Sequence, residues 1–317
     1  MGLEQSFRLC SSAFTRMMLG FGLIYQILRR LISNVRYWLL VYLDNRAKKR
    51  YPYIGGGNVG RLTSRLVLKQ VPLNRSRVEA EAIRFVRQHT SLPVPRLRMY
   101  WEEGTIGSLI IDYAEGETLQ RAWKRLSDEQ RSSVMRKVAG FVQELRSIPQ
   151  PPPPPGSSLP RSGWIGSPLG NPFHDCRMTS SEDPFGPFPS EREFNDWKVS
   201  RFAPFGERSV TAAAHIAQLR RAMSDQHPIV FTHGDINRRN ILVRIHGDGP
   251  DDVEITAFID WEQAGWRPIH WESVKWRFMG GMATDWTDFA VDEIGAGYGA
   301  DIALEEELQD ISGHIPY

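Results

Sequence analysis

The chain has little cysteine, little net charge and no long apolar run. Only two of its 317 residues are cysteines, Cys10 and Cys176, so the sequence offers no disulfide framework and indicates a reducing compartment. The formal net charge of +2 at pH 7 argues against a dedicated nucleic-acid-binding protein. The sequence also lacks a cysteine–histidine cluster with the spacing of a zinc site.

The first fifty residues hold the most apolar stretches, at 17–28 and 37–43, with basic residues at 29–30 and 46–50. Neither stretch approaches the roughly 20 residues that a membrane-spanning helix needs, and no small-residue cleavage site follows cleanly, as it would after a secretory signal. We expect residues 1–48 to form a helical N-terminal segment. It either packs on the domain that follows, the favoured alternative, or makes peripheral membrane contact through residues 13–50.

The strongest chemical signal lies in two segments of the C-terminal half, His233-Gly234-Asp235 and, further on, Phe258-Ile-Asp-Trp-Glu262. Apolar runs at 241–243 and 255–259, separated by turn residues, predict two short strands joined as a hairpin. Such a hairpin returns Asn240 and Asp260 to one end, where an amide oxygen and a carboxylate can converge on one metal ion. Asp235 precedes the hairpin in a polar loop and can take a proton from an acceptor hydroxyl. These residue types suit phosphoryl transfer.

On these segments the chain resembles the aminoglycoside phosphotransferase and choline-kinase-like family, and in particular its large fungal group of phosphotransferase enzymes. The likeness spans roughly residues 50–300. It implies an α+β, protein-kinase-like two-lobe fold. The small N-lobe, an antiparallel sheet with a helix, would cover residues 49–114, and the larger, mainly helical C-lobe would cover residues 115–317.

The resemblance also implies ATP as the phosphate donor and Mg²⁺ as the metal. It makes Asp235 the catalytic base, Asn240 and Asp260 the metal ligands, and His233 a brace that holds the loop through hydrogen bonds. A chance His-Gly-Asp in a turn is the alternative for the first segment alone. The second aspartate at the end of an apolar run makes that alternative less favoured.

The N-terminal half contains candidates for a nucleotide site. Glycine backbones can approach phosphates closely, which points to Gly56, Gly57 and Asn58. Lys69 falls on the second of two expected strands, 59–62 and 65–71, and could reach the α- and β-phosphates. Taken alone, the glycines also fit a plain loop, and the lysine also fits a solvated strand residue.

A helix is expected next, beginning at the capping-box pattern Ser76-Arg77-Val78-Glu79 and ending at Leu92-Pro93. The resemblance implies Glu81 as the partner of Lys69, with Glu79 as the second choice because Glu79 is expected to cap the helix.

The apolar run at 107–111 predicts a central buried strand that enters a turn at Gly116. The resemblance makes residues 112–114 the hinge between the lobes. It implies that backbone groups of Asp112 and Ala114 bind the adenine edge.

A second capping box, from Ser127 to Gln130, predicts a helix with one apolar stripe that ends before the prolines at 149–155. The proline run is expected to be a stiff connector. Residues 156–190 are rich in glycine, proline and serine, yet they carry aromatic residues. They are expected to form a structured insertion, interpreted as a substrate flap near the acceptor, with a surface loop on the large lobe as the alternative.

Acceptor-binding residues are harder to choose. Acidic side chains of the C-lobe could hold a cationic acceptor, and tryptophans could stack on it. Each kind of residue has an ordinary role as well, the acids as solvated or capping residues and the tryptophans as core. The acidic candidates are Glu262, Glu272, Asp285 and Asp288. The tryptophans, for which core packing is favoured, are Trp261, Trp266, Trp271, Trp276 and Trp286.

Departures from protein kinases decide the expected function. Asn237 stands where protein kinases carry lysine, and Asp260 is followed by Trp-Glu rather than Phe-Gly. The sequence has no Ala-Pro-Glu signature. We expect a cytoplasmic, ATP- and Mg²⁺-dependent enzyme that phosphorylates a hydroxyl of a small molecule. A catalytically silent, kinase-shaped binding or scaffold protein and a protein-kinase-like activity are the alternatives.

Overall fold

The computed structural model describes residues 35, 38–43, 45–51, 57–178, 183–207, 210–280 and 285–311. The chain divides into two compact units, residues 1–67 and residues 68–317. Most of the N-terminal segment expected at 1–48, and most of the membrane contact expected at 13–50, lies outside the described residues. Among the helices that are described, none is long and apolar enough to cross a membrane.

The first unit contains helical residues at 38–43 and 45–48 and the strand β1 (Val59–Arg61). Arg61 stabilises the turn that follows β1, because its guanidinium donates to the backbone oxygens of Thr63 and Ser64 at 3.1 and 2.9 Å. The same guanidinium lies over the ring of Tyr51. The chain then enters β2 (Leu66–Pro72), which confirms the strand–turn–strand pattern predicted for this region.

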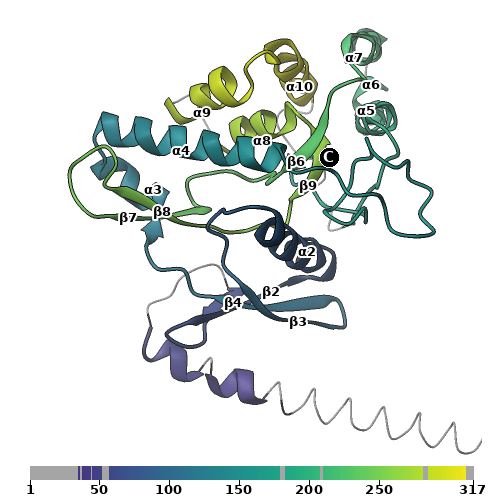
Figure 1. Ribbon diagram of the computed structural model, residues 1–317. Helices are drawn as coiled ribbons and strands as arrows, with labels where there is room; N and C mark the ends of the chain where they lie inside the picture. Colours follow the sequence, from purple (N-terminus) through teal and green to yellow (C-terminus); the bar gives the residue numbers. More distant parts are fainter. Residues whose placement is uncertain are drawn as a thin grey trace, which may run out of the picture. The chain divides into compact units, whose positions relative to one another are not determined.

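In the second unit, β2 continues into a small sheet in which β4 (Ile106–Asp112) lies between β2 and β3 (Leu97–Glu103). β3 and β4 are antiparallel, with Tyr100 opposite Leu109. Helix α2 (Leu73–His89) connects β2 to β3 and packs on β3 and β4 (Figure 1). This region is the small lobe that carries Lys69.

Helix α2 does not begin where the sequence pattern predicted. It starts at Leu73, directly after Pro72, and no side chain caps its first turn. Ser76 therefore lies inside the helix, where its hydroxyl donates to the Leu73 carbonyl at 2.8 Å. The predicted cap at Ser76 is wrong because a serine hydroxyl can bond a carbonyl three residues back as readily as it caps a helix.

The remaining elements form the larger lobe. Two small sheets lie there, one with the order β5-β7-β8 and one in which β6 pairs with β9. Their strands are β5 (Glu117–Thr118), β6 (Ile229–Thr232), β7 (Ile241–Ile245), β8 (Val253–Phe258) and β9 (Gly265–Pro268). The helices are α3 (Leu119–Ala122), η1 (Trp123–Arg125), α4 (Asp128–Arg146), α5 (Glu191–Ser200), α6 (Ala203–Gly206), α7 (Val210–Ala222), α8 (Trp271–Gly280), α9 (Asp285–Phe289), η2 (Ala290–Ile294) and α10 (Gly299–Ile311).

Helix α4 begins as predicted. The Ser127 hydroxyl accepts the backbone N–H of Gln130, and the Gln130 side chain accepts the backbone N–H of Ser127. The Gln130 amide also donates to the carbonyls of Gly247 and Gly249 in the β7–β8 turn. The cap thus fixes the helix and the hairpin against each other.

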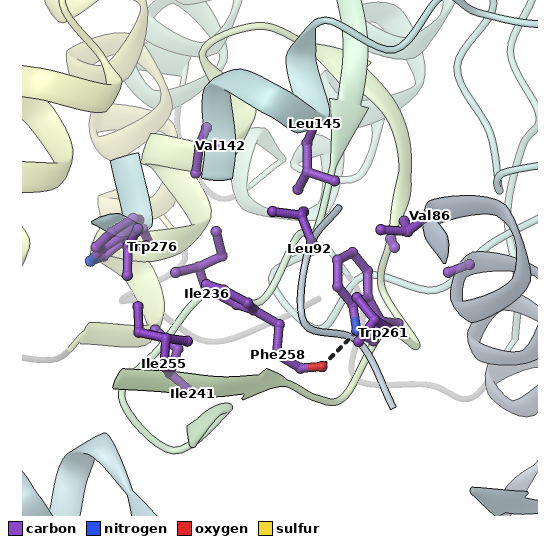
Figure 2. Packing of buried hydrophobic residues seen from close by; sticks show 14 of the residues in the cluster. Val86, Leu92, Val142, Leu145, Ile236, Ile241, Ile255, Phe258, Trp261 and Trp276 are labelled. Atoms are coloured by element: carbon purple, nitrogen blue, oxygen red, sulfur yellow. Dashed lines mark hydrogen bonds between the residues drawn. The ribbon is translucent and has the colours of Figure 1, made fainter. Parts of the chain in front are cut away.

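The apolar stripe of α4 is confirmed as core. Figure 2 shows Val142 and Leu145 close to Ile236 and Leu92. The indole N–H of Trp261 donates to the Phe258 carbonyl at 3.0 Å. The five tryptophans weighed as stacking residues are at most 1% exposed, so their role is packing and they cannot stack on an acceptor.

The insertion at 156–190 is structured, as expected, although it contains no helix or extended strand in its described part. Short antiparallel bridges join Ile165 to Phe188 and Phe173 to Phe185, and Gly166 pairs with Trp266 of β9. Aromatic rings from residues 173, 185 and 188 pack together. The insertion also contacts the small lobe through Glu81 of α2.

Candidate active site

The β7–β8 hairpin brings Asn240 and Asp260 together, as predicted. Ile241 is opposite Phe258, and just beyond this pair the Ile259 N–H donates to the Asn240 carbonyl at 3.0 Å. Asp260 has a φ of +69°, the one positive φ found for a non-glycine residue in the described part of the chain. This left-handed backbone, disfavoured by about 1 kcal/mol or more, turns the chain directly after the hairpin.

Lys69 of β2 lies among three carboxylates. Its Nζ atom is 2.5 Å from Asp260, 2.8 Å from Glu79 and 3.3 Å from Glu262. Burial disfavours the ammonium ion, but the carboxylates outweigh it and hold the pKa of Lys69 well above its ordinary value. Burial likewise disfavours the charged Asp260, yet the Lys69 ammonium lowers the pKa of that carboxyl below its usual range. Lys69 and Asp260 are therefore a charged pair at neutral pH.

Glu79, and not Glu81, is the α2 residue that contacts Lys69. Glu81 instead accepts hydrogen bonds from Ser167 and Asn171 of the insertion, each at 2.9 Å. The expected Lys69–Glu81 pair is therefore wrong. The helical repeat supplies the reason, because Glu79 is three, four and seven residues from the apolar positions Ala82, Ile83 and Val86, so it shares their face. Glu81 is displaced by about 200° around the helix from Glu79.

Glu79 is nearly fully buried, and its environment opposes its charge. Burial and the nearby carboxylates raise the pKa of Glu79 to about 7, although Lys69 acts in the opposite direction. Glu262 is also shared, since it lies 3.4 Å from Arg75 as well as 3.3 Å from Lys69. The cluster thus holds three carboxylates against two cations.

Asp235 is held by two neutral amides. Its Oδ1 atom accepts from the side chain of Asn237 at 2.9 Å, and its Oδ2 atom accepts from the side chain of Asn240 at 2.8 Å. Burial raises the pKa of Asp235 to about 7, against the attraction of the Lys275 ammonium. A carboxyl with a pKa near the working pH suits proton transfer.

The backbone of the loop before Asp235 is fixed by Glu272 at the start of α8. The carboxylate of Glu272 accepts the N–H groups of His233 and Gly234 at 2.7 and 3.0 Å. Gly234 has a φ of +74°, and a Cβ atom there would lie 2.6 Å from the Gln263 carbonyl oxygen. Only glycine fits this position without displacement of the backbone.

The His233 ring bonds to its own loop and to the end of the β7–β8 hairpin. Its Nδ1 atom accepts the Asp235 N–H at 3.2 Å, so Nε2 carries the proton and donates to the Ile259 carbonyl at 3.2 Å. Burial lowers the pKa of His233 to about 4, which keeps the ring neutral. These bonds join the loop of Asp235 to the end of the hairpin that carries Asp260.

The model of the phosphotransferase enzyme family matches residues 53–309, most of the chain. The chain belongs to this family. No curated protein sequence matches it. Among solved structures, an aminoglycoside-3'-phosphotransferase of type VIII is similar, with 17% identity and a TM-score of 0.50 over 86% of this chain and 99% of that one.

The protein in the streptomycin–ATP–APH(2")-IIa ternary complex is also similar. Its identity is 16% and its TM-score 0.50, over 84% of this chain and 83% of that one. Likeness at these identities concerns the fold. It confirms the protein-kinase-like architecture that the family resemblance implied.

The other nucleotide-site candidates are the glycine loop and the end of β4. Gly56 is outside the described residues, and Gly57 and Asn58 are exposed turn residues of the first unit. Asp112 ends β4, where Arg98 pairs with its carboxylate at 2.6 Å and its N–H donates to the Arg96 carbonyl. The backbone carbonyl of Asp112 and the groups of Ala114 stay predicted contacts of the adenine.

The acidic acceptor candidates divide into two kinds. Glu272 is fully buried and occupied by the loop backbone, and Glu262 belongs to the Lys69 cluster. Neither is placed to hold a cationic acceptor. Asp285 and Asp288 are exposed at α9.

Proposed function

We propose that this protein transfers the γ-phosphoryl group of ATP to a hydroxyl of a small molecule in a Mg²⁺-dependent reaction. The observation that carries the proposal is the meeting of Lys69 from β2, Glu79 from α2 and Asp260 from the hairpin end. Kinase-like sites use a lysine–glutamate pair and a metal-binding aspartate in this combination. Family membership supports phosphoryl transfer, and the streptomycin–ATP complex of the APH(2")-IIa protein supports a small-molecule acceptor.

The residues at the hairpin end fit a magnesium ion. Asn240 uses its amide nitrogen to hold Asp235, so its amide oxygen is the atom that can bind a metal. Asp260 adds a carboxylate, and magnesium prefers such oxygen ligands. The excess of carboxylates over cations around Lys69 favours a divalent cation in the same place. When bound, Mg²⁺ would neutralise charge that develops on the transferred phosphoryl group.

Side chains of the protein would bind the phosphates, accept the proton and position the loop. Lys69, oriented by Glu79, would bind phosphate oxygens of the nucleotide. Asp235 would accept the proton of the acceptor hydroxyl, and its two amide partners would keep its carboxylate in one orientation. His233 would hold the loop in place through its two bonds. Positioning of this kind supplies much of the rate enhancement in phosphoryl transfer.

Asp235→Asn tests the proposal against a catalytically silent scaffold. A screen of ATP consumption with alcohols and amino sugars as acceptors would use this variant as its blank. We expect turnover with at least one acceptor in the wild type, a loss of roughly 10²- to 10⁴-fold in Asp235→Asn, and unchanged nucleotide affinity. A wild type that neither binds Mg²⁺–ATP nor consumes it with any acceptor would favour the silent scaffold. A protein-kinase-like activity is less favoured, because Asn237 replaces the lysine of protein kinases.

A further inference from the structure

Three side chains that the proposed reaction does not use form a second cluster of potential metal ligands. Glu191 is the first residue of α5, His227 lies in the loop between α7 and β6, and His270 directly precedes α8. One ligand atom from each lies within 4.8 Å of the other two. All three side chains are buried or nearly so, with Glu191 and His270 at most 4% exposed. Three distant segments of the chain therefore meet at one polar point.

The bonds of His227 leave a place for a cation. Its Nε2 atom is 3.3 Å from a carboxylate oxygen of Asp301, which suits donation by an Nε2–H group. Its Nδ1 atom is 2.7 Å from Oε1 of Glu191. A neutral ring that donates from Nε2 presents a lone pair at Nδ1, so two acceptor atoms face each other there. At 2.7 Å these two atoms share a proton, and a metal ion bound to both would replace that proton.

His270 provides the observation that favours a metal. Its Nδ1 atom is buried and has no hydrogen-bond partner among the residues that the structure describes. Buried polar atoms are almost always bonded, so an unbonded nitrogen on a ring that belongs to this cluster is consistent with a missing ligand. The two rings lie edge to face, with centroids 4.6 Å apart.

We propose that Glu191, His227 and His270 bind one Zn²⁺ ion. Two imidazoles and a carboxylate are ligands that zinc accepts, and a water molecule would complete a tetrahedral shell. Asp301 would orient His227 through its Nε2–H group, as outer carboxylates do in many histidine–metal sites. The ion would join α5 and the loop before β6 to the start of α8, where Glu272 holds the loop of Asp235. Its role is to fix these elements, and it is separate from the proposed Mg²⁺ site.

The test begins with the full-length chain, stripped with a chelator and titrated with ZnCl₂. Zinc bound per chain would be measured by mass spectrometry of the metal, and the melting temperature would be followed with and without zinc. His270→Ala and His227→Ala remove one ligand each. His246→Ala is the matched histidine control, because His246 is half-exposed on the hairpin, and Asp260→Asn removes a carboxylate from the proposed Mg²⁺ site. Co²⁺ in place of Zn²⁺ reports tetrahedral coordination by its visible absorption.

We expect the wild type, His246→Ala and Asp260→Asn to bind about one Zn²⁺ per chain and to melt a few degrees higher with zinc. Both ligand variants should lose the ion and the shift. A wild type that binds no zinc would overturn the proposal. Loss of zinc in Asp260→Asn, or its retention in both ligand variants, would equally overturn it. The zinc titration of the wild type tests the proposal even if a ligand variant fails to fold.

Discussion

At the scale of single residues, Glu79 and Glu81 offer a matched pair. Glu79→Gln removes a carboxylate that lies 2.8 Å from Lys69, so the lysine loses the group that, in the proposed function, orients it toward phosphate. We expect Mg²⁺–ATP affinity, measured by calorimetry, to fall roughly 10-fold. Glu81→Gln changes contacts with Ser167, Asn171 and the Leu169 backbone rather than with Lys69, and should leave the affinity within about 2-fold. The opposite order of effects would restore the pairing first expected from the sequence.

The family resemblance favoured Glu81 as the partner of Lys69, whereas the helical repeat of apolar residues favours Glu79. The family likeness placed a glutamate partner on the right helix but in the wrong register. The positions of Ala82, Ile83 and Val86 in the sequence define the face that packs on the sheet, and Glu79 lies on that face. The helical repeat was therefore sufficient to select Glu79. The contact of Glu262 with Lys69 had no such signal, because it depends on how the two lobes meet.

At the scale of elements, the cap of α4 can be tested directly. Ser127→Ala removes the hydroxyl that accepts the Gln130 N–H and should destabilise the protein by about 1 kcal/mol. The expected fall in melting temperature is roughly 1–2 °C for a chain of 317 residues. Ser132→Ala, inside the same helix, is the control, and it should leave the melting temperature almost unchanged. Equal losses in both variants would mean that the cap adds nothing to stability.

The two capping-box patterns show why elements are only partly predictable from sequence. Ser127 and Gln130 form the predicted cap, whereas Ser76 and Glu79 have the same spacing and do not. In the second case the chain passes from β2 into the helix at Pro72, and Glu79 forms an ion pair with Lys69 instead. The hairpin at 241–258 was predictable because its two apolar runs and its turn agree. The bridges of the insertion were not, since they pair single residues far apart.

At the scale of the whole molecule, a buried ionic network should set the acid stability. Glu305 of α10 accepts from Arg177 of the insertion at 2.9 Å and from Lys198 of α5. Burial favours the neutral acid, but the two cations outweigh it and lower the pKa of Glu305 to about 2. Because this value is below the unfolded one, the stabilisation is complete above about pH 4.5 and is lost as the pH falls toward 2.

Urea unfolding at pH 7, 5 and 3.5 would measure this contribution. Glu305→Gln leaves Arg177 and Lys198 buried without their counter-charge, so the free energy of unfolding at pH 7 should fall by roughly 3–5 kcal/mol. The variant should also lose less stability than the wild type between pH 5 and 3.5. Glu306→Gln is the control, because Glu306 pairs with Arg277 at the surface and such pairs contribute about 1 kcal/mol or less. Parallel pH profiles in Glu305→Gln and the wild type would contradict the assignment.

In the proposed function, nucleotide and metal contact elements of both lobes, so their binding should stabilise the folded chain as a whole. Mg²⁺ and ATP together should raise the melting temperature of the wild type, since ligands that bind only the folded state do so by mass action. ATP with a chelator should give a much smaller shift, because Asp260 and Asn240 would then lack the ion that links them to phosphate. Asp260→Ala should show the same small shift with or without Mg²⁺, while Glu81→Gln should respond like the wild type. An Asp260→Ala variant with the full Mg²⁺-dependent shift would place the metal elsewhere and remove the basis for assigning Asp260 as its ligand.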